Sequence, residues 1–253
     1  MNSLINTYRP ITLEEMSTVK LMNRIDTKFV TTQDKLESLL EMARHEYRMQ
    51  QIGSERNMEY LTTYFDTADY AMYCSHQHGH ANRQKLRFRT YVSSQLQFME
   101  IKTKNNHGRT KKKRISVDNM VFDQEKVDFM QKYLQYDPAR LQPVLTNNFR
   151  RITLVNKGRT ERLTIDSNLL FHNEETGINR DMGPLVIIEL KRDGLQHSPV
   201  LEMLRRLHIH PHGFSKYCMG SALTNHVLPV NRFKPQLHDV ERLISSSQRM
   251  FSV

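Results

Sequence analysis

The chain has 253 residues, of which 38% are hydrophobic and 25% are charged, a balance typical of globular proteins that excludes a disordered chain. Lysine and arginine outnumber aspartate and glutamate by 37 to 27, which gives a formal net charge of +10. This excess predicts a polyanionic partner, but composition does not choose among nucleic acid, an anionic membrane surface and a phosphorylated small molecule.

The two cysteines, Cys74 and Cys218, stand in unrelated contexts, and no CxxC motif is present. A disulfide scaffold is not needed at this size and two cysteines are too few for a structural zinc site, so two buried free thiols are expected. The N-terminus lacks the features of a signal peptide, and no run of about 18 apolar residues is present. We therefore expect a cytoplasmic protein without a transmembrane segment, and the sequence leaves open whether it works at the inner face of the membrane.

Apolar residues at helical spacing predict one helical turn and three helices. The turn is expected from Thr12 to Met16, and the helices from Thr32 to Met49, from Asp123 to Leu134 and from Ser198 to Leu207. We expect a single domain over residues 8–225. The tail that follows, residues 226–253, is expected to form a short helix from Asp239 to Ile244 or to be disordered.

Between these helices the sequence alternates with period two, which predicts strands. The strands are expected over Asn23 to Val30, Gln84 to Tyr91, Phe98 to Lys104, Lys111 to Val117, Phe149 to Val155, Glu161 to Asp166 and Val186 to Lys191. In each strand one face is apolar, and the other face carries Lys and Arg with isolated Asp and Glu. These polar faces hold Arg24, Asp26 and Lys28; Lys85, Arg87 and Arg89; Glu100, Lys102 and Lys104; Lys112 and Arg114; Arg151; Arg162 and Asp166; Glu189 and Lys191.

The repeated charged face favours an α+β fold built on a closed antiparallel β-barrel, with a charged lumen and helices covering the apolar exterior. A sandwich with solvated polar faces and a flat basic sheet are the alternatives. Many like charges in a narrow lumen repel one another and resist desolvation. They become tolerable when a polyanion, usually with a divalent metal, fills the space.

Several of these strands carry motifs in a characteristic order. They are KLRFRTY from Lys85 to Tyr91, Glu100-Ile-Lys102, ERLTID from Glu161, VIIELK from Val186 and Phe214-Ser-Lys216-Tyr217. Together they resemble the VTC domain, the polyphosphate polymerase branch of the CYTH-like triphosphate tunnel metalloenzymes, from about Tyr8 to Asn225. The resemblance implies an antiparallel tunnel fold that transfers the γ-phosphate of ATP to a growing polyphosphate chain with Mn²⁺ or Mg²⁺.

The resemblance also implies roles for individual residues. Lys28 matches the basic residue of the first tunnel strand, and Arg87 and Arg89 match the pair that holds the nucleotide phosphates. Lys102 and Lys112 match lysines of the phosphate path. Arg151, Arg162, Ser215 and Lys216 match two hairpin arginines and a Ser-Lys pair near the terminal phosphate, with Arg151 and Lys216 also expected to contact the nucleotide. Glu189 matches the metal-binding glutamate, and Glu100, Asp166 and Asp26 are further candidates for the metal site or, alternatively, form ion pairs.

Two positions depart from the family pattern. Related triphosphatases have Glu-x-Glu-x-Lys in the first strand, whereas this chain has Arg24-Ile-Asp26-Thr-Lys28. Loss of the first carboxylate argues against simple triphosphate hydrolysis. Phe149 replaces the usual Tyr, which removes one possible hydrogen bond to phosphate.

Two further patterns, the spaced histidines and a basic run, have alternative interpretations. His76, His78 and His80, like His208, His210 and His212, recur at i, i+2 spacing. No carboxylate or cysteine completes either set, so we expect surface or loop histidines rather than zinc ligands. The basic run from Lys111 to Arg114 is typical of nucleic-acid patches, but no nucleic-acid module is evident and we expect no aromatic stacking platform on the basic faces.

Three functions therefore remain open from the sequence. The first is an ATP-dependent polyphosphate polymerase, acting on ATP and on polyphosphate or pyrophosphate. The second is a hydrolase of tripolyphosphate or nucleoside triphosphates, and the third is a sensor that binds polyphosphate or inositol phosphates without turnover. No specific nucleic-acid partner is expected. If synthesis is coupled to membrane passage, a separate membrane protein must supply the channel.

Overall fold

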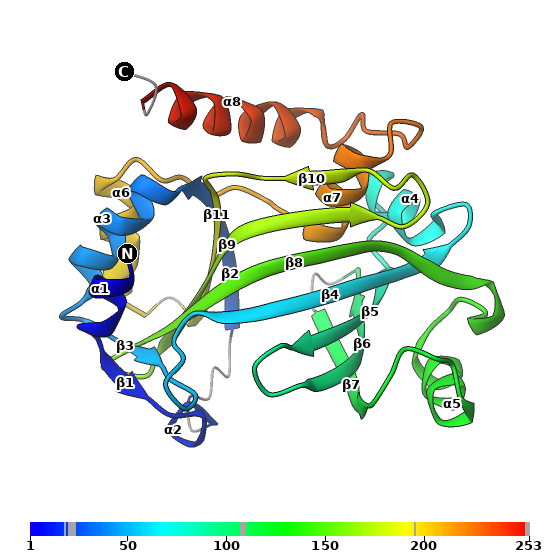
Figure 1. Cartoon of the computed structure of the whole chain (residues 1–253), viewed down its shortest axis with the longest axis horizontal. Coiled ribbons are helices and arrows are strands. Elements are labelled where there is room, and N and C mark those ends of the chain that lie inside the picture. The colour runs from blue at the N-terminus through cyan, green and yellow to red at the C-terminus, as the bar shows by residue number, and fades with distance from the viewer. Residues whose placement is uncertain (18, 20–23, 107–109, 195, 251–253) are drawn as a thin grey trace.

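A computed structural model describes residues 1–17, 19, 24–106, 110–194 and 196–250 (Figure 1). The strands are β1 (Arg9–Ile11), β2 (Arg24–Thr32), β3 (Tyr47–Gln50), β4 (Met58–Thr67), β5 (Arg83–Tyr91), β6 (Leu96–Lys104), β7 (Thr110–Val117), β8 (Leu141–Asn156), β9 (Glu161–Asn173), β10 (Asn179–Asp181) and β11 (Leu185–Asp193). The helices are α1 (Asn2–Asn6), α2 (Leu13–Ser17), α3 (Gln33–Ala43), α4 (Ala71–Gln77), α5 (Gln124–Tyr133), α6 (Pro199–Arg206), α7 (Lys216–Thr224) and α8 (Lys234–Met250), with a 3₁₀ turn over Pro138–Arg140.

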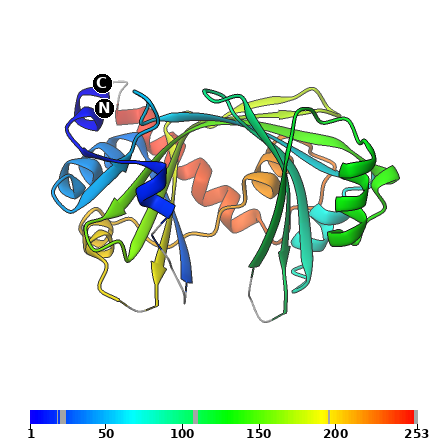
Figure 2. The same ribbon diagram turned by 90° about the horizontal axis from the view of Figure 1, so that it is seen from below.

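The strands form one strongly bent sheet with the order β2-β11-β9-β8-β4-β5-β6-β7, and every neighbouring pair on this path is antiparallel. Figure 2 shows the sheet as an arch. The α+β class and the antiparallel sheet with flanking helices are confirmed, but the closed barrel is wrong. In the described part of the chain, β2 and β7 end the path and do not pair with each other.

A connecting segment lies against the free edge of β2. Phe29 forms an isolated bridge with Pro211, and the amide of His212 donates to the carbonyl of Lys28 at 2.8 Å. Proline has no N–H to donate, and this contact is an isolated bridge rather than part of a regular strand. The chain then crosses the concave side to reach β5: Lys28 Nζ donates to the Phe214 carbonyl (2.8 Å), and Lys85 Nζ donates to Ser215 Oγ (2.6 Å).

Helices cover the convex face of the arch in two groups. Alternate residues of β2, β8, β9 and β11, such as Phe29 and Ile188, pack with α1, α3 and α6. Leu86, Phe88 and Ile101 of β5 and β6 pack with Met130 of α5. The apolar residues of the alternating pattern therefore lie on the convex face, and the charged residues lie on the concave face.

The concave face changes character along β2, β8, β9 and β11. Towards one end it is apolar, with Val30, Ile187, Leu169 and Phe171 packed against α7 and α8. Towards the other end the same parity carries the charged residues. Figure 2 shows α7 and α8 between the two arms of the arch, so these helices cover one half of the concave face and leave the charged half.

Two expected elements differ from the structure. The helix expected from Thr32 to Met49 ends at Ala43, where its apolar helical spacing also stops, and β3 follows. The alternating residues Tyr47 and Met49 are buried, and β3 pairs with β1 and β8. At the C-terminus, the segment from Asp239 to Ile244 is part of the 17-residue α8, and Val240 is buried in the concave cluster.

The other expected elements agree within a few residues, although β8 and β9 are longer than expected. Asn23 lies outside the described residues, as does the side chain of Arg24. Strands β1, β3, β4 and β10 and helices α1, α4 and α7 were not predicted. Within the described residues, no helix combines the length and apolar character needed to cross a membrane.

Candidate functional site: a cationic concave face

The first charged cluster centres on Glu100 of β6, whose side chain is 1% exposed. Its carboxylate accepts from Arg87 Nε at 2.7 Å and from Lys112 Nζ at 2.8 Å. Burial alone would raise the pKa of Glu100, but Arg87, Arg89 and Lys112 outweigh it and lower the pKa to about 2. Glu100 is therefore an anion that spaces and neutralises two cations from the neighbouring strands.

The second cluster centres on Asp166 of β9. Arg151 of β8, directly opposite in the register, donates from Nε and from a terminal nitrogen to the two carboxylate oxygens at 2.5 and 2.7 Å. Lys216, the first residue of α7, also donates to Asp166. Burial opposes ionisation of Asp166, but the two cations lower its pKa below the usual range.

An aromatic pair lies beneath three cations of this region. The rings of Tyr60 and Phe149 stack with centroids 5.3 Å apart and planes at 10°. Lys216 Nζ lies 4.0 Å from the Phe149 centroid, and the guanidinium carbons of Arg151 and Arg89 lie 5.3 and 5.7 Å from it. Such contacts hold a cation in place without neutralising it. Phe149, which differs from the family pattern, therefore supports the cations through its ring.

Arg89 has few other partners. Its Nε donates to Thr62 Oγ1 at 3.2 Å, and its side chain forms no ion pair with any carboxylate in the described part of the chain. Burial, followed by Arg87 and Arg151, lowers the pKa of Arg89 to about 10. The guanidinium stays charged at neutral pH, so it is a buried cation whose charge an incoming anion would balance.

The third cluster lies on β2 and β11. Glu189 and Lys191 share one face, and their side chains form an ion pair at 2.5 Å. Lys28 stands directly opposite Glu189, and Asp26 stands directly opposite Lys191, 4.0 Å from its Nζ. Burial opposes ionisation of Glu189, but Lys191 and Lys28 lower its pKa to about 2.

A row of lysines crosses three adjacent strands. Lys85, Lys102 and Lys112 are direct cross-strand neighbours on β5, β6 and β7. Like charges placed directly opposite each other destabilise a sheet. Partial burial in the concave face, followed by Lys28 and Lys85, lowers the pKa of Lys102 to about 7, although its side chain keeps access to solvent. The row therefore lowers the stability of the unliganded sheet, and a bound polyanion would offset this loss.

The N-terminus of α7 points to this row. Ser215 is the N-cap residue, and its Oγ accepts from the Cys218 amide at 3.2 Å as well as from Lys85 Nζ. An N-terminal helix dipole favours bound anions, so it adds to the positive potential of the lysines.

The carboxylates differ in their fitness to hold a divalent metal. Glu100 and Asp166 each bridge two cations, so their oxygens are already engaged. Within the described residues, no three His, Cys, Asp or Glu side chains gather as a metal cage. Glu189 pairs with Lys191 through one carboxylate oxygen, so its other oxygen could contact Mg²⁺ or Mn²⁺ together with phosphate and water. The donor set fits a metal held jointly with a phosphorylated ligand at Glu189 and does not fit one at Glu100 or Asp166.

The structure brings all the residues expected from the resemblance to the concave side. Lys28, Arg87, Arg89, Lys102, Lys112, Arg151, Arg162, Glu189, Ser215 and Lys216 lie on strands β2, β5, β6, β7, β8, β9 and β11 or at the start of α7. Arg162 stands opposite Lys191 in the register. Lys85, although placed on the charged face, was not predicted from the sequence as a site residue, and neither were Tyr60, Thr62 and Tyr64 of β4. Their Tyr-x-Thr-x-Tyr alternation is the signal that would have revealed this strand.

Contrary to expectation, aromatic side chains do stand on the basic face. Tyr60 and Phe149 do so beside Arg89, and Tyr91 and Phe98 continue the same parity on β5 and β6.

The histidines and cysteines of the sequence have local roles. His76 lies in α4 rather than in a loop, and its Nδ1 is 2.8 Å from Sγ of Cys218. Burial, followed by Lys85 and Arg83, lowers the pKa of His76 to about 2, so the ring is neutral. Both cysteines are free thiols; Cys218 is buried and Cys74 partly so.

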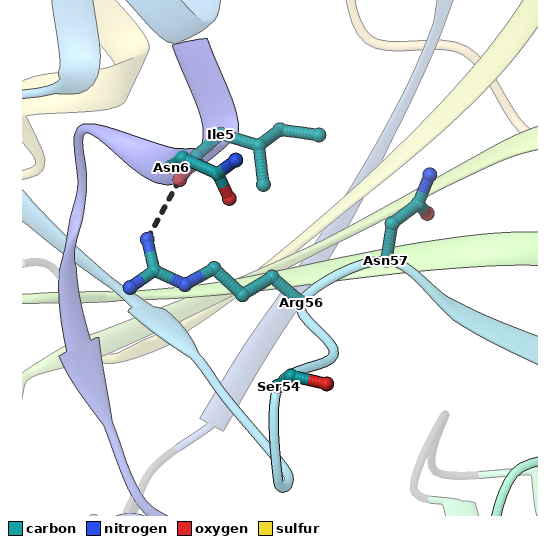
Figure 3. Close-up of a pocket in the computed structure, with 5 residues that line it drawn as sticks. All are labelled: Ile5, Asn6, Ser54, Arg56 and Asn57. Carbon is teal, nitrogen blue, oxygen red and sulfur yellow. Dashed lines mark hydrogen bonds between the residues drawn. The ribbon is translucent and has the colours of Figure 1, made fainter. Parts of the chain in front are cut away.

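A separate pocket of about 220 Å³ lies between α1 and the loop before β4 (Figure 3). It is lined by Ile5, Asn6, Ser54, Arg56 and Asn57. Arg56 donates to the carbonyls of Ile5 and Tyr8 at 2.8 and 2.9 Å, so its guanidinium ties the N-terminal segment to the loop. None of the concave-face residues lines this pocket.

The fold and site define a bent antiparallel sheet whose inner face carries clustered lysine and arginine side chains. The family model of the VTC domain matches residues 23–225, and the chain belongs to this family. A search of the curated proteins gave no match.

Among solved structures, a candidate adenylate cyclase from Bacillus halodurans is 16% identical with a TM-score of 0.48, covering 84% of this chain and 99% of that chain. A candidate adenylyl cyclase from Hippeastrum, described as having a dominant triphosphatase activity, is 15% identical with a TM-score of 0.46, covering 82% and 99%. A candidate adenylate cyclase from Vibrio parahaemolyticus is 10% identical with a TM-score of 0.44, covering 78% and 97%. At these values the structural similarities carry no argument about function, and the family assignment rests on the family model.

Proposed function

We propose that this protein is a metal-dependent polyphosphate polymerase that transfers the γ-phosphate of ATP to a growing polyphosphate chain on its concave face. The observation that carries the proposal is the row Lys85, Lys102 and Lys112, placed directly opposite one another, with the buried cation Arg89 further along β5; Glu100 pairs with Lys112 and offsets part of this charge. Like charges gathered at this density favour a ligand with several adjacent negative charges over one with a single anionic group.

The residue types suit phosphoryl transfer. This reaction needs neutralisation of charge and in-line positioning more than a covalent catalyst. Arg89 and Arg151, held over the Tyr60–Phe149 pair, would bind phosphate oxygens through planar guanidinium groups. Lys102 would follow the charge as it moves between phosphates, because a lysine side chain is flexible and acts as a point charge. Bound Mg²⁺ or Mn²⁺, held at Glu189, would supply further positive charge on the phosphate oxygens.

The carboxylates favour transfer to phosphate over transfer to water. A hydrolase must activate a water molecule, commonly with metal ions or a free carboxylate as base. Here Glu100 and Asp166 are fixed between cations, and Arg24 replaces a carboxylate of the triphosphatase pattern. This arrangement supports a polymerase ahead of a hydrolase.

Incubation of the purified protein with ATP and Mn²⁺ or Mg²⁺, followed by a polyphosphate gel and a free-phosphate assay, tests the proposal. A ladder of chains that is lost in Glu189→Gln, while tripolyphosphate binding remains, is the expected result. Free phosphate without chain growth would select the hydrolase. Tight binding of polyphosphate without any product under either metal would select a sensor.

A further inference from the structure

The cationic face does not end at Arg89 but continues into a row of aromatic rings. Tyr91 follows Arg89 by two residues on β5, and Phe98 stands directly opposite Arg89 on β6. The ring centroids of Tyr60 and Tyr91 are 4.9 Å apart, and those of Tyr91 and Phe98 are 5.7 Å apart. The row therefore runs from the buried Tyr60 out to the half-buried Tyr91 and Phe98.

The rings of Tyr91 and Phe98 are not mainly packed inside the hydrophobic core. Tyr91 is only partly buried at the margin of the concave cluster, and Phe98 belongs to none of the hydrophobic clusters found in the described residues. The guanidinium carbon of Arg114 lies 4.6 Å from the Phe98 centroid, and Arg114 is exposed. A half-exposed ring beneath a solvent-exposed guanidinium is a surface onto which a flat, uncharged group could stack.

The order of side chains along β5 indicates the kind of ligand that would fit this surface. Lys85, Arg87, Arg89 and Tyr91 share one face, so successive members are roughly 7 Å apart along the strand. Lys85 and Arg89, whose side chains have no carboxylate partner in the described part of the chain, flank Arg87, which is paired with Glu100, and an aromatic ring follows them. A nucleoside triphosphate presents the same order, with three phosphates followed by a sugar and a flat base. At the other end of this row, Lys85 meets Ser215 and the N-terminus of α7.

We propose that Tyr91 and Phe98 form a stacking platform for the base of a nucleoside triphosphate whose phosphates lie along β5, with the terminal phosphate toward Lys85 and Ser215. This inference rests on the proposed function and adds a base subsite to it. The planes of Tyr91 and Phe98 meet at 81°, so a base would stack on the face of one ring and contact the edge of the other. Such contacts are not specific for one base, so the platform would accept purines and pyrimidines alike and would favour a nucleotide over bare tripolyphosphate.

Binding of ATP and of tripolyphosphate, each with Mg²⁺, to wild type, Tyr91→Ala and Phe98→Ala tests the platform. Because stacking of a base on an aromatic side chain contributes about 1–3 kcal/mol, we expect the Kd for ATP to rise roughly tenfold in each variant. The Kd for tripolyphosphate should stay unchanged. Phe98→Tyr should retain ATP affinity, and CTP should bind wild type within a fewfold of ATP.

Phe129→Ala is the matched control, because Phe129 is a half-buried phenylalanine on α5 that packs on Tyr133. It should leave both affinities unchanged. Unchanged ATP affinity in both platform variants would overturn the base subsite. Equal weakening of ATP and tripolyphosphate would also overturn it, because the rings would then act only by supporting Arg89. If wild type binds neither ligand, the proposed function itself falls.

Discussion

Glu100, Asp166 and Glu189 are chemically similar residues with different surroundings. Glu100 and Asp166 are almost fully buried, and each is held between cations from two other elements. Glu189 is 21% exposed and pairs with Lys191 on its own strand. The neighbours, rather than the residue type, therefore separate a structural counter-ion from a candidate metal ligand.

Glu100→Gln should destabilise the unliganded protein, because it leaves Arg87 and Lys112 without their shared anion. Removing one partner of a buried ion pair costs about 3 kcal/mol, and the partial exposure of Lys112 reduces its share. Since the folded-state pKa of Glu100 is lowered to about 2 from an ordinary 4.5, its contribution is present above pH 4.5 and lost as pH falls toward 2.

Chemical unfolding as a function of pH, with and without tripolyphosphate, measures this effect. The stability difference between wild type and variant should vanish at low pH, and tripolyphosphate should stabilise the variant more than wild type. Glu125→Gln, on the exposed side of α5, is the control. Unaltered stability combined with loss of metal-dependent turnover would instead identify Glu100 as a metal ligand.

Lys102 should make phosphate binding depend on pH near neutrality. With a pKa of about 7, it is protonated below this pH and loses its charge above it, so it favours anion binding on the acidic side. Lys102→Arg keeps a permanent charge. We expect the ratio of tripolyphosphate affinities, variant to wild type, to rise severalfold from pH 6 to pH 8.5 in calorimetric titrations.

The ratio of affinities is used because tripolyphosphate itself gains negative charge between pH 6 and pH 8.5. This change in the ligand affects its binding to wild type and to the variant equally. Lys113→Arg, on the exposed outer side of β7, should show a constant ratio. Parallel pH profiles for wild type and Lys102→Arg would show that Lys102 keeps an ordinary pKa.

At the scale of elements, the segment that enters α7 joins the two arms of the sheet. Lys28 of β2 donates to the carbonyl of Phe214, and Lys85 of β5 donates to Ser215. These are side-chain bonds, whereas closure of a barrel would require a backbone ladder between edge strands. The sequence contained Phe214-Ser-Lys216-Tyr217 as a motif, but its role as a bridge depends on where β2 and β5 lie.

Ser215→Ala should weaken both the helix and the site. Loss of an N-cap hydroxyl costs about 1 kcal/mol of unfolding free energy, and Lys85 loses the group that orients it. We expect severalfold weaker tripolyphosphate binding together with the loss of stability, and Ser215→Thr should restore both. Ser246→Ala, in the exposed part of α8, should change neither quantity. Reduced stability with full affinity would mean that Ser215 acts only as a helix cap.

At the scale of the whole molecule, α7 and α8 occupy half of the concave face. Where these helices pack, the strand residues that point to the concave side are apolar. In the rest of the concave face, the residues that point the same way are charged. Phe233, just before α8, contacts the rings of Tyr73 and His76 with centroids 5.7 Å away in each case. The C-terminal segment is thus part of the core beside the site.

Phe233→Ala should lower the unfolding free energy by about 3–5 kcal/mol, because it removes a buried aromatic ring from a packed cluster. Urea unfolding followed by circular dichroism measures this change. The exposed neighbour Lys234→Ala should be nearly neutral. A neutral effect of Phe233→Ala would show that residues after 225 behave as a detached tail.

The sequence by itself determined which side chains of each strand share a face, because the period of two is a local property of extended backbone. Lys28, Arg87, Lys102, Arg151 and Glu189 could therefore be assigned to one polar surface, and the ordered motifs indicated the family. Only the tertiary structure decided that the sheet stays open, that Glu100 and Asp166 are counter-ions, and that α8 covers the apolar half. Register, edge pairing and the meeting of distant ions depend on packing between segments far apart in the chain, which local patterns do not encode.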